Sequence, residues 1–199
     1  MPENAEPFGF MQDKTMQFTP LSLKGAYAIE LAPRGDERGR FTRLFCAREL
    51  ARIGHTKPIV NVNYSYTQKA GTIRGMHFQY PPDCEVKIVK CLRGAIWDCI
   101  VDIRKDSPTF LKWEGVELTE SNNQMIYVPE GFAHGFQSLS DDVEIVYFVS
   151  NFYAPNNEDG LRFDDPALNI QWPLEVTEVS ARDREHRLCS QNFKGVTLT

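Results

Sequence analysis

The sequence contains no apolar run that approaches the ~20 residues of a membrane-spanning helix. Residues 1–19 also lack the basic start and the apolar stretch of a signal peptide. Basic residues are in the minority, with 22 Lys and Arg against 27 Asp and Glu, so the concentrated basic surface of a nucleic-acid-binding protein is not expected. We therefore expect a cytoplasmic protein that binds neither membranes nor nucleic acids.

Cysteines are few and show no metal-binding or disulfide pattern. There are five, an odd number, and none forms a CxxC pair: Cys46, Cys84, Cys91, Cys99 and Cys189. Reduced, buried cysteines that act as small hydrophobic residues are the simplest interpretation. An apolar content of 42% and a charged content of 25% are ordinary for a folded globular chain.

Long helical periodicity is missing, and short alternating segments dominate instead. We expect strands over residues 25–31, 40–45, 86–93, 95–104, 112–118, 124–128 and 143–150, with turn residues between them. A short helix is expected over residues 47–53 before Gly54, and Ser180 is expected to cap another over 181–187. This pattern favours an all-β sandwich or barrel. We expect an N-terminal tail over 1–18, a β domain over 19–175 and a C-terminal helix and tail over 176–199.

Two of the four histidines lie in segments similar to the two cupin motifs. Residues 129–136 (PEGFAHGF) resemble the second motif, which carries His134, and residues 75–79 (GMHFQ) resemble the first, with Gln79 in place of its second histidine. A metal site of His77, His134 and Glu85 is one possibility, because two histidines and a carboxylate suit iron or manganese. Lys87 argues against it, because residues 85 and 87 share a strand face and an ammonium would repel the cation.

A longer set of motifs resembles the dTDP-4-dehydrorhamnose 3,5-epimerase family of the cupin superfamily. Residues 71–79 (GTIRGMHFQ) are similar to its GxLRGLHYQ motif, and the matches continue in order through residues 85–89, 101–104, 107–110 and 129–136, then Tyr147, 153–155, 164–166 and 172–173. The similarity spans about residues 21–173. It implies a cupin fold, that is, a double-stranded β-helix or jelly-roll barrel with short peripheral helices.

The resemblance also implies a reaction, the inversion of carbons that flank the 4-keto group of a nucleotide-linked 6-deoxyhexose. His77 matches the base, Asp165 the carboxylate paired with it, Lys87 the residue beside the keto oxygen, and Tyr147 the opposing acid. An imidazole with an ordinary pKa of ~6.5 suits proton transfer near neutral pH. The residues expected to bind substrate are Arg38, Phe41, Arg43, Asn61, Asn63, Arg74, Gln79 and His134. Neither a cofactor nor a metal is implied.

Each residue taken singly also has a structural interpretation. His134 and Tyr147 read as hydrogen-bonded core residues, Asp165 as a loop former and Arg38 as a solvated turn residue. Lys87 is harder to explain without a function, because burying an unpaired charge is costly. His55 and His186 match no motif, and we expect them at the surface.

Two positions depart from the family pattern and leave the substrate open. Arg43 stands where the family usually has a glutamate, and Asn61 where it usually has a glutamine. A reversed charge at the first position alters which nucleotide or sugar is held. The leading interpretation is a 3,5-epimerase or a relative that inverts one of the two carbons. A metal-dependent cupin enzyme and a non-catalytic sugar-nucleotide-binding cupin are the alternatives. The family resemblance further implies a homodimer formed by exchange of N-terminal strands.

Overall fold

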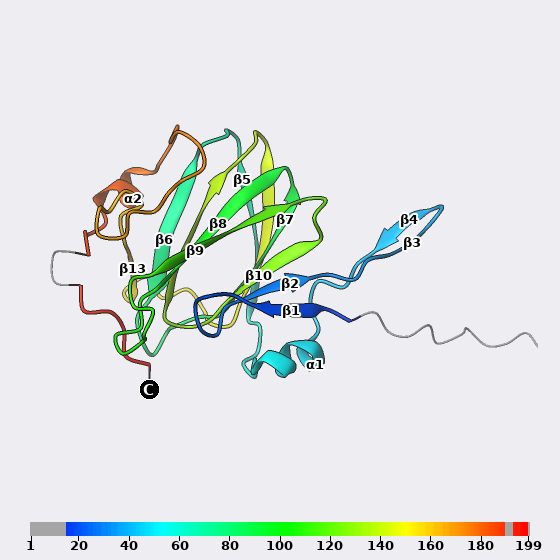
Figure 1. The fold of residues 1–199 in the computed structure, drawn as a ribbon, viewed down its shortest axis with the longest axis horizontal. Helices are drawn as coiled ribbons and strands as arrows, with labels where there is room; N and C mark the ends of the chain where they lie inside the picture. Colours follow the sequence, from blue (N-terminus) through cyan, green and yellow to red (C-terminus); the bar gives the residue numbers. More distant parts are fainter. Residues whose placement is uncertain (1–14, 190–192, 199) are drawn as a thin grey trace, which may run out of the picture.

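Two antiparallel β-sheets form the body of the chain (Figure 1). The computed structural model describes residues 15–189 and 193–198. The six-stranded sheet has the order β1 (Gln17–Pro20), β2 (Tyr27–Glu30), β10 (Gln124–Val128), β7 (Lys87–Arg93), β12 (Val143–Val149) and β5 (Asn61–Thr67). The five-stranded sheet has the order β13 (Glu158–Gly160), β6 (Ile73–Gln79), β11 (Phe132–Ser138), β8 (Ala95–Asp102) and β9 (Trp113–Thr119).

The central core lies between the two sheets. Its buried residues come from strands of both, with Val89 and Cys91 on β7, Ile145 on β12, and Ile96 and Ile100 on β8. These side chains point inward because successive residues of a strand alternate between the two faces of a sheet. Removing this apolar surface from water is the main favourable contribution to the barrel's stability.

Two further apolar clusters cover the outer faces of the sheets. One includes Phe78 on β6 and Cys189, Phe193 and Val196 of the C-terminal segment. The other includes Ile88 on β7 and Leu50 on the short helix α1 (Ala47–Leu50). A 3-10 turn, η1 (Ala51–Ile53), extends α1 and ends at Gly54 with a left-handed φ of 84°. The helix α2 (Ala181–Glu185) lies beside β6 at the other side of the body (Figure 1).

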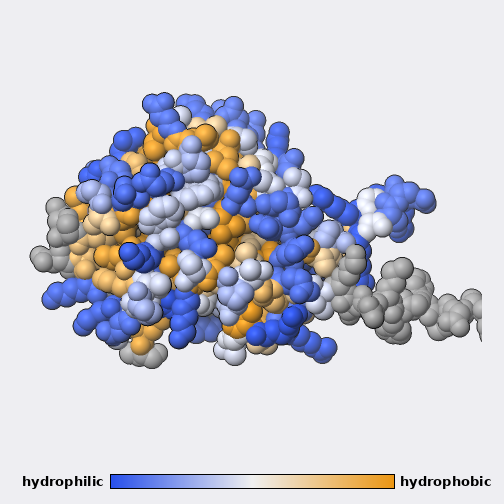
Figure 2. Space-filling model, in the orientation of Figure 1, coloured by the Kyte–Doolittle hydropathy of each residue, from blue (hydrophilic) through white to orange (hydrophobic). Residues whose placement is uncertain are grey.

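A small hairpin projects away from the barrel. It consists of β3 (Arg34–Asp36) and β4 (Gly39–Phe41), which pair only with each other (Figure 1). In the face drawn in Figure 2, apolar surface shows over parts of the barrel, whereas the projecting hairpin is hydrophilic or neutral. The hairpin buries little of itself against its own chain, since every residue of both strands is exposed.

The expected all-β cupin barrel with short peripheral helices is confirmed. The expected strand over 40–45 is shorter, ending at Phe41, and the expected helix over 181–187 ends at Glu185. Most of the expected N-terminal tail lies outside the described residues. At its end, Met16 is buried and donates its backbone N–H to Glu49 at 2.6 Å, and β1 begins at Gln17. Among the described residues, no helix is long and apolar enough to cross a bilayer.

Candidate active site

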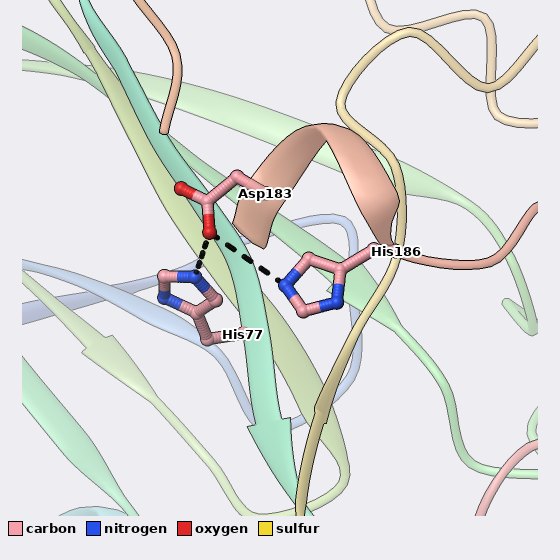
Figure 3. A group of neighbouring side chains, drawn as sticks. All are labelled: His77, Asp183 and His186. Carbon is pink, nitrogen blue, oxygen red and sulfur yellow. Dashed lines mark hydrogen bonds and ion pairs between the residues drawn. The ribbon is translucent and has the colours of Figure 1, made fainter. Parts of the chain in front are cut away.

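The centre of the site is a hydrogen-bonded pair of His77 and Asp183 (Figure 3). His77 lies on β6, and its Nε2 is 2.7 Å from Oδ1 of Asp183 on α2. Burial alone would raise the pKa of the Asp183 carboxyl. The neighbouring imidazoles of His186 and His77 and the backbone N–H of Gly75 outweigh that effect and hold the pKa well below its usual range. An ionised carboxylate only accepts hydrogen bonds, so Nε2 of His77 carries the proton and Nδ1 keeps the free lone pair.

Gly75 brings Asp183 and β11 close to β6. Its backbone N–H donates to Oδ2 of Asp183 at 3.2 Å. Its φ is 124°, and a Cβ at this position would lie 2.6 Å from Cα of Gly135 on β11, where the register between β6 and β11 shifts. A side chain at Gly75 would therefore push the two strands apart. This close approach of β6 and β11 fixes the position of the backbone that carries His77.

The expected pairing of His77 with Asp165 is wrong. Asp165 is 1% exposed and its carboxylate accepts the backbone N–H groups of Ala167, at 2.8 Å, and of Cys189. Its side chain is therefore used to hold a turn and to anchor the C-terminal segment, as its loop-former interpretation suggested. Asp183 takes the place beside His77 because the C-terminal segment folds back over β6.

Lys87 reaches the site from the other sheet. It lies on β7, its side chain is 14% exposed, and its Nζ is 3.1 Å from Oε1 of Glu85. The side chains of residues 85 and 87 lie on the same side of the chain, as the sequence predicted, and they form an ion pair. Glu85 thereby compensates the cost of burying the ammonium and holds it at the cavity wall.

Tyr147 lies on β12, the neighbour of β7 in the six-stranded sheet. Lys87 is opposite Val149 in the register of these strands, so Tyr147 and Lys87 are diagonal neighbours. Burial raises the pKa of the Tyr147 phenol and the charge of Glu85 adds to the rise, while Arg74 opposes it. The hydroxyl is thus kept protonated at neutral pH.

Two adjoining cavities, of about 680 and 540 Å³, share His77, Lys87 and Tyr147 as common walls. The larger is also lined by Arg74, His134 and three residues of α2, Arg182, Asp183 and Arg184. The smaller is also lined by Asn61, Asn63, Gln79 and Glu85. Eight of the twelve site residues expected from the sequence line these cavities, so the structure brings this part of the predicted site together: His77, Lys87, Tyr147, Asn61, Asn63, Arg74, Gln79 and His134.

Several of these side chains already have protein partners. His134 is 2.9 Å from the fully buried Asp98. Arg74 donates to the Thr67 hydroxyl at 3.0 Å and to the Tyr66 carbonyl at 3.1 Å. The amide of Gln79 binds three backbone groups, donating to Asp83 and Phe152 and accepting from Ala154. Gln79 therefore has a clear part in holding the loops at the cavity, and its contact with substrate stays a prediction.

Arg38, Phe41 and Arg43 do not line these cavities in their own chain. Arg38 pairs with Asp36 within the projecting hairpin, where Phe41 is 67% exposed. Arg43 lies beyond the hairpin and pairs with Glu49 at 3.0 Å. A single chain therefore leaves these three expected substrate-binding residues away from His77.

The metal set of His77, His134 and Glu85 does not fit a cation. Nε2 of His134 is engaged with Asp98, Glu85 is engaged with Lys87, and Nε2 of His77 points to Asp183. Within the described ranges, the only His, Cys, Asp and Glu side chains that converge closely enough for a metal are His77, Asp183 and His186. The cupin metal chemistry considered above has no ligand set here.

The expectation that His55 and His186 lie at the surface is wrong. His55 is 5% exposed and its Nδ1 is 3.3 Å from the hydroxyl of Tyr127. His186 has a side chain that is 10% exposed, and its Nε2 is 3.6 Å from Oδ1 of Asp183. The spacing of Asp183 and His186, three residues apart at a predicted helix, indicated that both share one face and was the available signal.

The sequence model of the dTDP-4-dehydrorhamnose 3,5-epimerase family matches residues 20–191, most of the chain. The chain belongs to this family. It is 43% identical to a dTDP-4-dehydrorhamnose 3,5-epimerase of Shigella flexneri over 75% of this chain and 82% of the relative. It is 35% identical to a dTDP-4-dehydrorhamnose 3-epimerase of Streptomyces niveus over 88% and 85%.

A solved structure supports the same assignment. The Legionella pneumophila dTDP-6-deoxy-D-glucose-3,5-epimerase, in complex with dTDP-4-keto-L-rhamnose, is similar with a TM-score of 0.87 at 34% identity, covering 93% of this chain and all of that one. The family, the epimerase activity and the isomerase class expected from the sequence are confirmed.

Proposed function

We propose that this epimerase inverts C3 and C5 of a nucleoside-diphosphate-linked 4-keto-6-deoxyhexose such as dTDP-4-dehydro-6-deoxyglucose. The observation that carries the proposal is the meeting of His77, Lys87 and Tyr147 at the wall shared by two cavities. The base and the cation come from different sheets, so a sugar ring between them meets each from a different direction.

His77 acts as the base in this proposal. Its Nδ1 removes the proton from a carbon beside the ketone, and Asp183 stabilises the imidazolium that forms. Lys87 faces the negative charge that develops on the keto oxygen. An ammonium ~4 Å from an oxyanion contributes about 4 kcal/mol at an effective dielectric constant of ~20, before the cost of desolvation.

Tyr147 returns a proton to the opposite face of the planar enolate. Its raised pKa keeps the phenol protonated and able to donate. A donor on the face opposite the base is what turns simple proton exchange into inversion. Once solvent has taken the proton from His77 and returned one to Tyr147, the same pair of groups serves the second carbon, because C3 and C5 both flank the one ketone.

Three arginines line the larger cavity and suit a pyrophosphate. Arg74, Arg182 and Arg184 line the space that also holds His77. Guanidinium groups bind phosphate oxygens in a bidentate manner. We assign the diphosphate to this group of arginines, and the nucleoside lies beyond it because the diphosphate joins the sugar to the nucleoside.

We further propose a homodimer in which the N-terminal hairpin of one protomer reaches the site of its partner. The hairpin carries the expected substrate residues Arg38 and Phe41, is exposed at every residue of its two strands, and projects from the barrel (Figure 1). A second copy would bring these side chains to the smaller cavity. We also propose a cytoplasmic location, which the five free thiols suit.

Deuterium exchange tests the reaction. In heavy water, the wild-type enzyme should incorporate deuterium into the keto sugar, and mass spectrometry should find two exchanged positions for a 3,5-epimerase and one for a 3-epimerase. His77→Ala should lower the rate by roughly 10²–10⁴-fold, the usual contribution of a general base. His55→Ala removes a buried histidine away from both cavities and serves as the control. Exchange by His77→Ala at the wild-type rate would refute the assignment.

A further inference from the structure

Two imidazole rings converge on one carboxylate oxygen at the site (Figure 3). His77 reaches Asp183 from β6, and His186 reaches it from the residue after α2. The two Nε2 atoms are 2.7 and 3.6 Å from Oδ1 of Asp183, and the three atoms lie within 4.8 Å of one another. The epimerase chemistry proposed above uses His77 and Asp183 and gives His186 no part.

His186 is held in place with its Nε2 near Asp183 but beyond hydrogen-bond distance of that carboxylate. Its side chain is nine-tenths buried, and its Nε2 has no hydrogen-bond partner among the residues that the structure describes. The ring packs over Gly160 of β13, where a Cβ would lie only 2.4 Å from Nε2. Gly160 thus makes room for the ring, and the ring fills the space that a side chain would occupy.

We propose that His77, Asp183 and His186 form a binding site for a divalent transition metal, with Zn²⁺ as the best match. Zinc bonds to imidazole nitrogen and carboxylate oxygen at about 2.0–2.2 Å, which places neighbouring tetrahedral ligands roughly 3.3 Å apart. The observed separations of 2.7 and 3.6 Å fall on either side of that value. The ion replaces the proton shared by His77 and Asp183.

The remaining groups complete the site. Oδ2 of Asp183 accepts the N–H of Gly75, so Oδ1 is left for the metal while the carboxylate stays oriented. His77 and Asp183 both line the larger cavity, from which an ion and a water ligand would reach the three ligand atoms. Two imidazoles, one carboxylate and an open position are a common ligand set for zinc.

Occupancy of this site blocks the epimerase, an inference that rests on the proposed function. A neutral imidazole has one lone pair, and a metal on Nε2 of His77 moves the remaining proton to Nδ1. The atom that removes the substrate proton is then no longer a base. Zn²⁺ is therefore a reversible inhibitor that acts on the catalytic pair itself.

Calorimetric titration of the full-length, untagged enzyme with zinc chloride tests binding without any sugar. The wild type should bind one ion per chain at micromolar concentration, and Co²⁺ should give the visible absorption bands of a tetrahedral site. His186→Phe keeps a flat ring and removes the ligand, so affinity should fall roughly tenfold or more. His55→Phe makes the same change at another buried histidine and should leave the affinity at the wild-type value.

The outcomes separate the metal site from the enzyme's reaction. Absence of zinc binding by the wild type at micromolar concentration, or equal affinity of the wild type and His186→Phe, overturns the site. If His186→Phe does not fold by circular dichroism, His186→Gln gives the same comparison. In the exchange assay, zinc should inhibit the wild type more strongly than His186→Phe, each measured against its own metal-free rate, with recovery after chelation. An enzyme that binds zinc but never turns over sugar would contradict the proposed function and leave the metal site standing.

Discussion

Lys87 is the residue at which enolate stabilisation can be separated from proton abstraction. Lys87→Met keeps most of the side-chain length and removes the charge, while His77 and Asp183 are untouched. We expect deuterium exchange to slow by about 10²–10³-fold, the range found when one oxyanion-stabilising group is lost. The rate is measured by mass spectrometry with saturating keto sugar.

Lys90 provides a matched control on the same strand. It is also buried, at 6% exposed, but it donates to the carbonyl of Thr119 at 2.7 Å and lines neither cavity. Residues 87 and 90 lie on opposite faces of β7 because their spacing is odd. Folded Lys90→Met should exchange deuterium at close to the wild-type rate, and equal losses in the two variants would assign Lys87 a purely structural part.

At the scale of elements, α2 is a five-residue helix that is stable only through its contacts. The hydroxyl of Ser180 accepts the N–H of Asp183 at 3.0 Å, and Arg182 pairs with Glu158 at β13. These contacts hold Asp183 over β6. The C-terminal segment therefore contributes Asp183 to the candidate active site and is more than a cover for the barrel.

The stability that Asp183 provides should depend on pH with a definite sign. Because its folded-state pKa is lowered, the ionised carboxylate stabilises the fold above the ordinary pKa of ~3.9, and this contribution is lost as pH falls further. Asp183→Asn should cost about 1–3 kcal/mol at neutral pH, the usual penalty for a lost partner of a buried hydrogen bond. Urea unfolding should show the two proteins converging below about pH 4. A difference that stays constant into acid would argue against an ionised Asp183.

The strands and helices differ in how well they can be predicted from the sequence. β10 was predicted with its observed ends at Gln124 and Val128, because a run of strand-forming residues lies between two turn segments, 121–123 and 129–131. β11 is buried at every residue, so period-two alternation is missing and the strand was not predicted. Asp183 was missed for a different reason, since its partner is 106 residues away and only the folded chain brings the two together. Motif matching placed His77, Lys87 and Tyr147 because each is local to its strand.

For the assembly of the molecule, the informative strand is β5, which has its polar side chains on the partly buried face and its larger apolar side chains on the exposed face. Asn61, Asn63 and Ser65 are partly buried and line the cavities, whereas Val62 and Tyr64 alternate with them, border the smaller cavity and are 59% and 60% exposed. β5 is also an edge of the six-stranded sheet. An exposed apolar edge strand can pair with another chain. The exposed hairpin is a second surface that another copy of the chain could cover. Both features are explained if a second copy covers them.

The assembly prediction follows from the exposed face of this strand. The wild type should sediment as a dimer at micromolar concentration, and a single monomeric species would refute the proposal. Replacing Val62 and Tyr64 together by glutamate should weaken association by roughly two orders of magnitude, because unpaired charges in an interface cost several kcal/mol. Leu174→Glu is the control, since Leu174 is similarly exposed, at 40%, but binds Gln137 of the other sheet. If the partner's hairpin completes the site, exchange activity of the double variant should fall with its dimer fraction and recover as protein concentration rises, because association restores Arg38 and Phe41 to the smaller cavity.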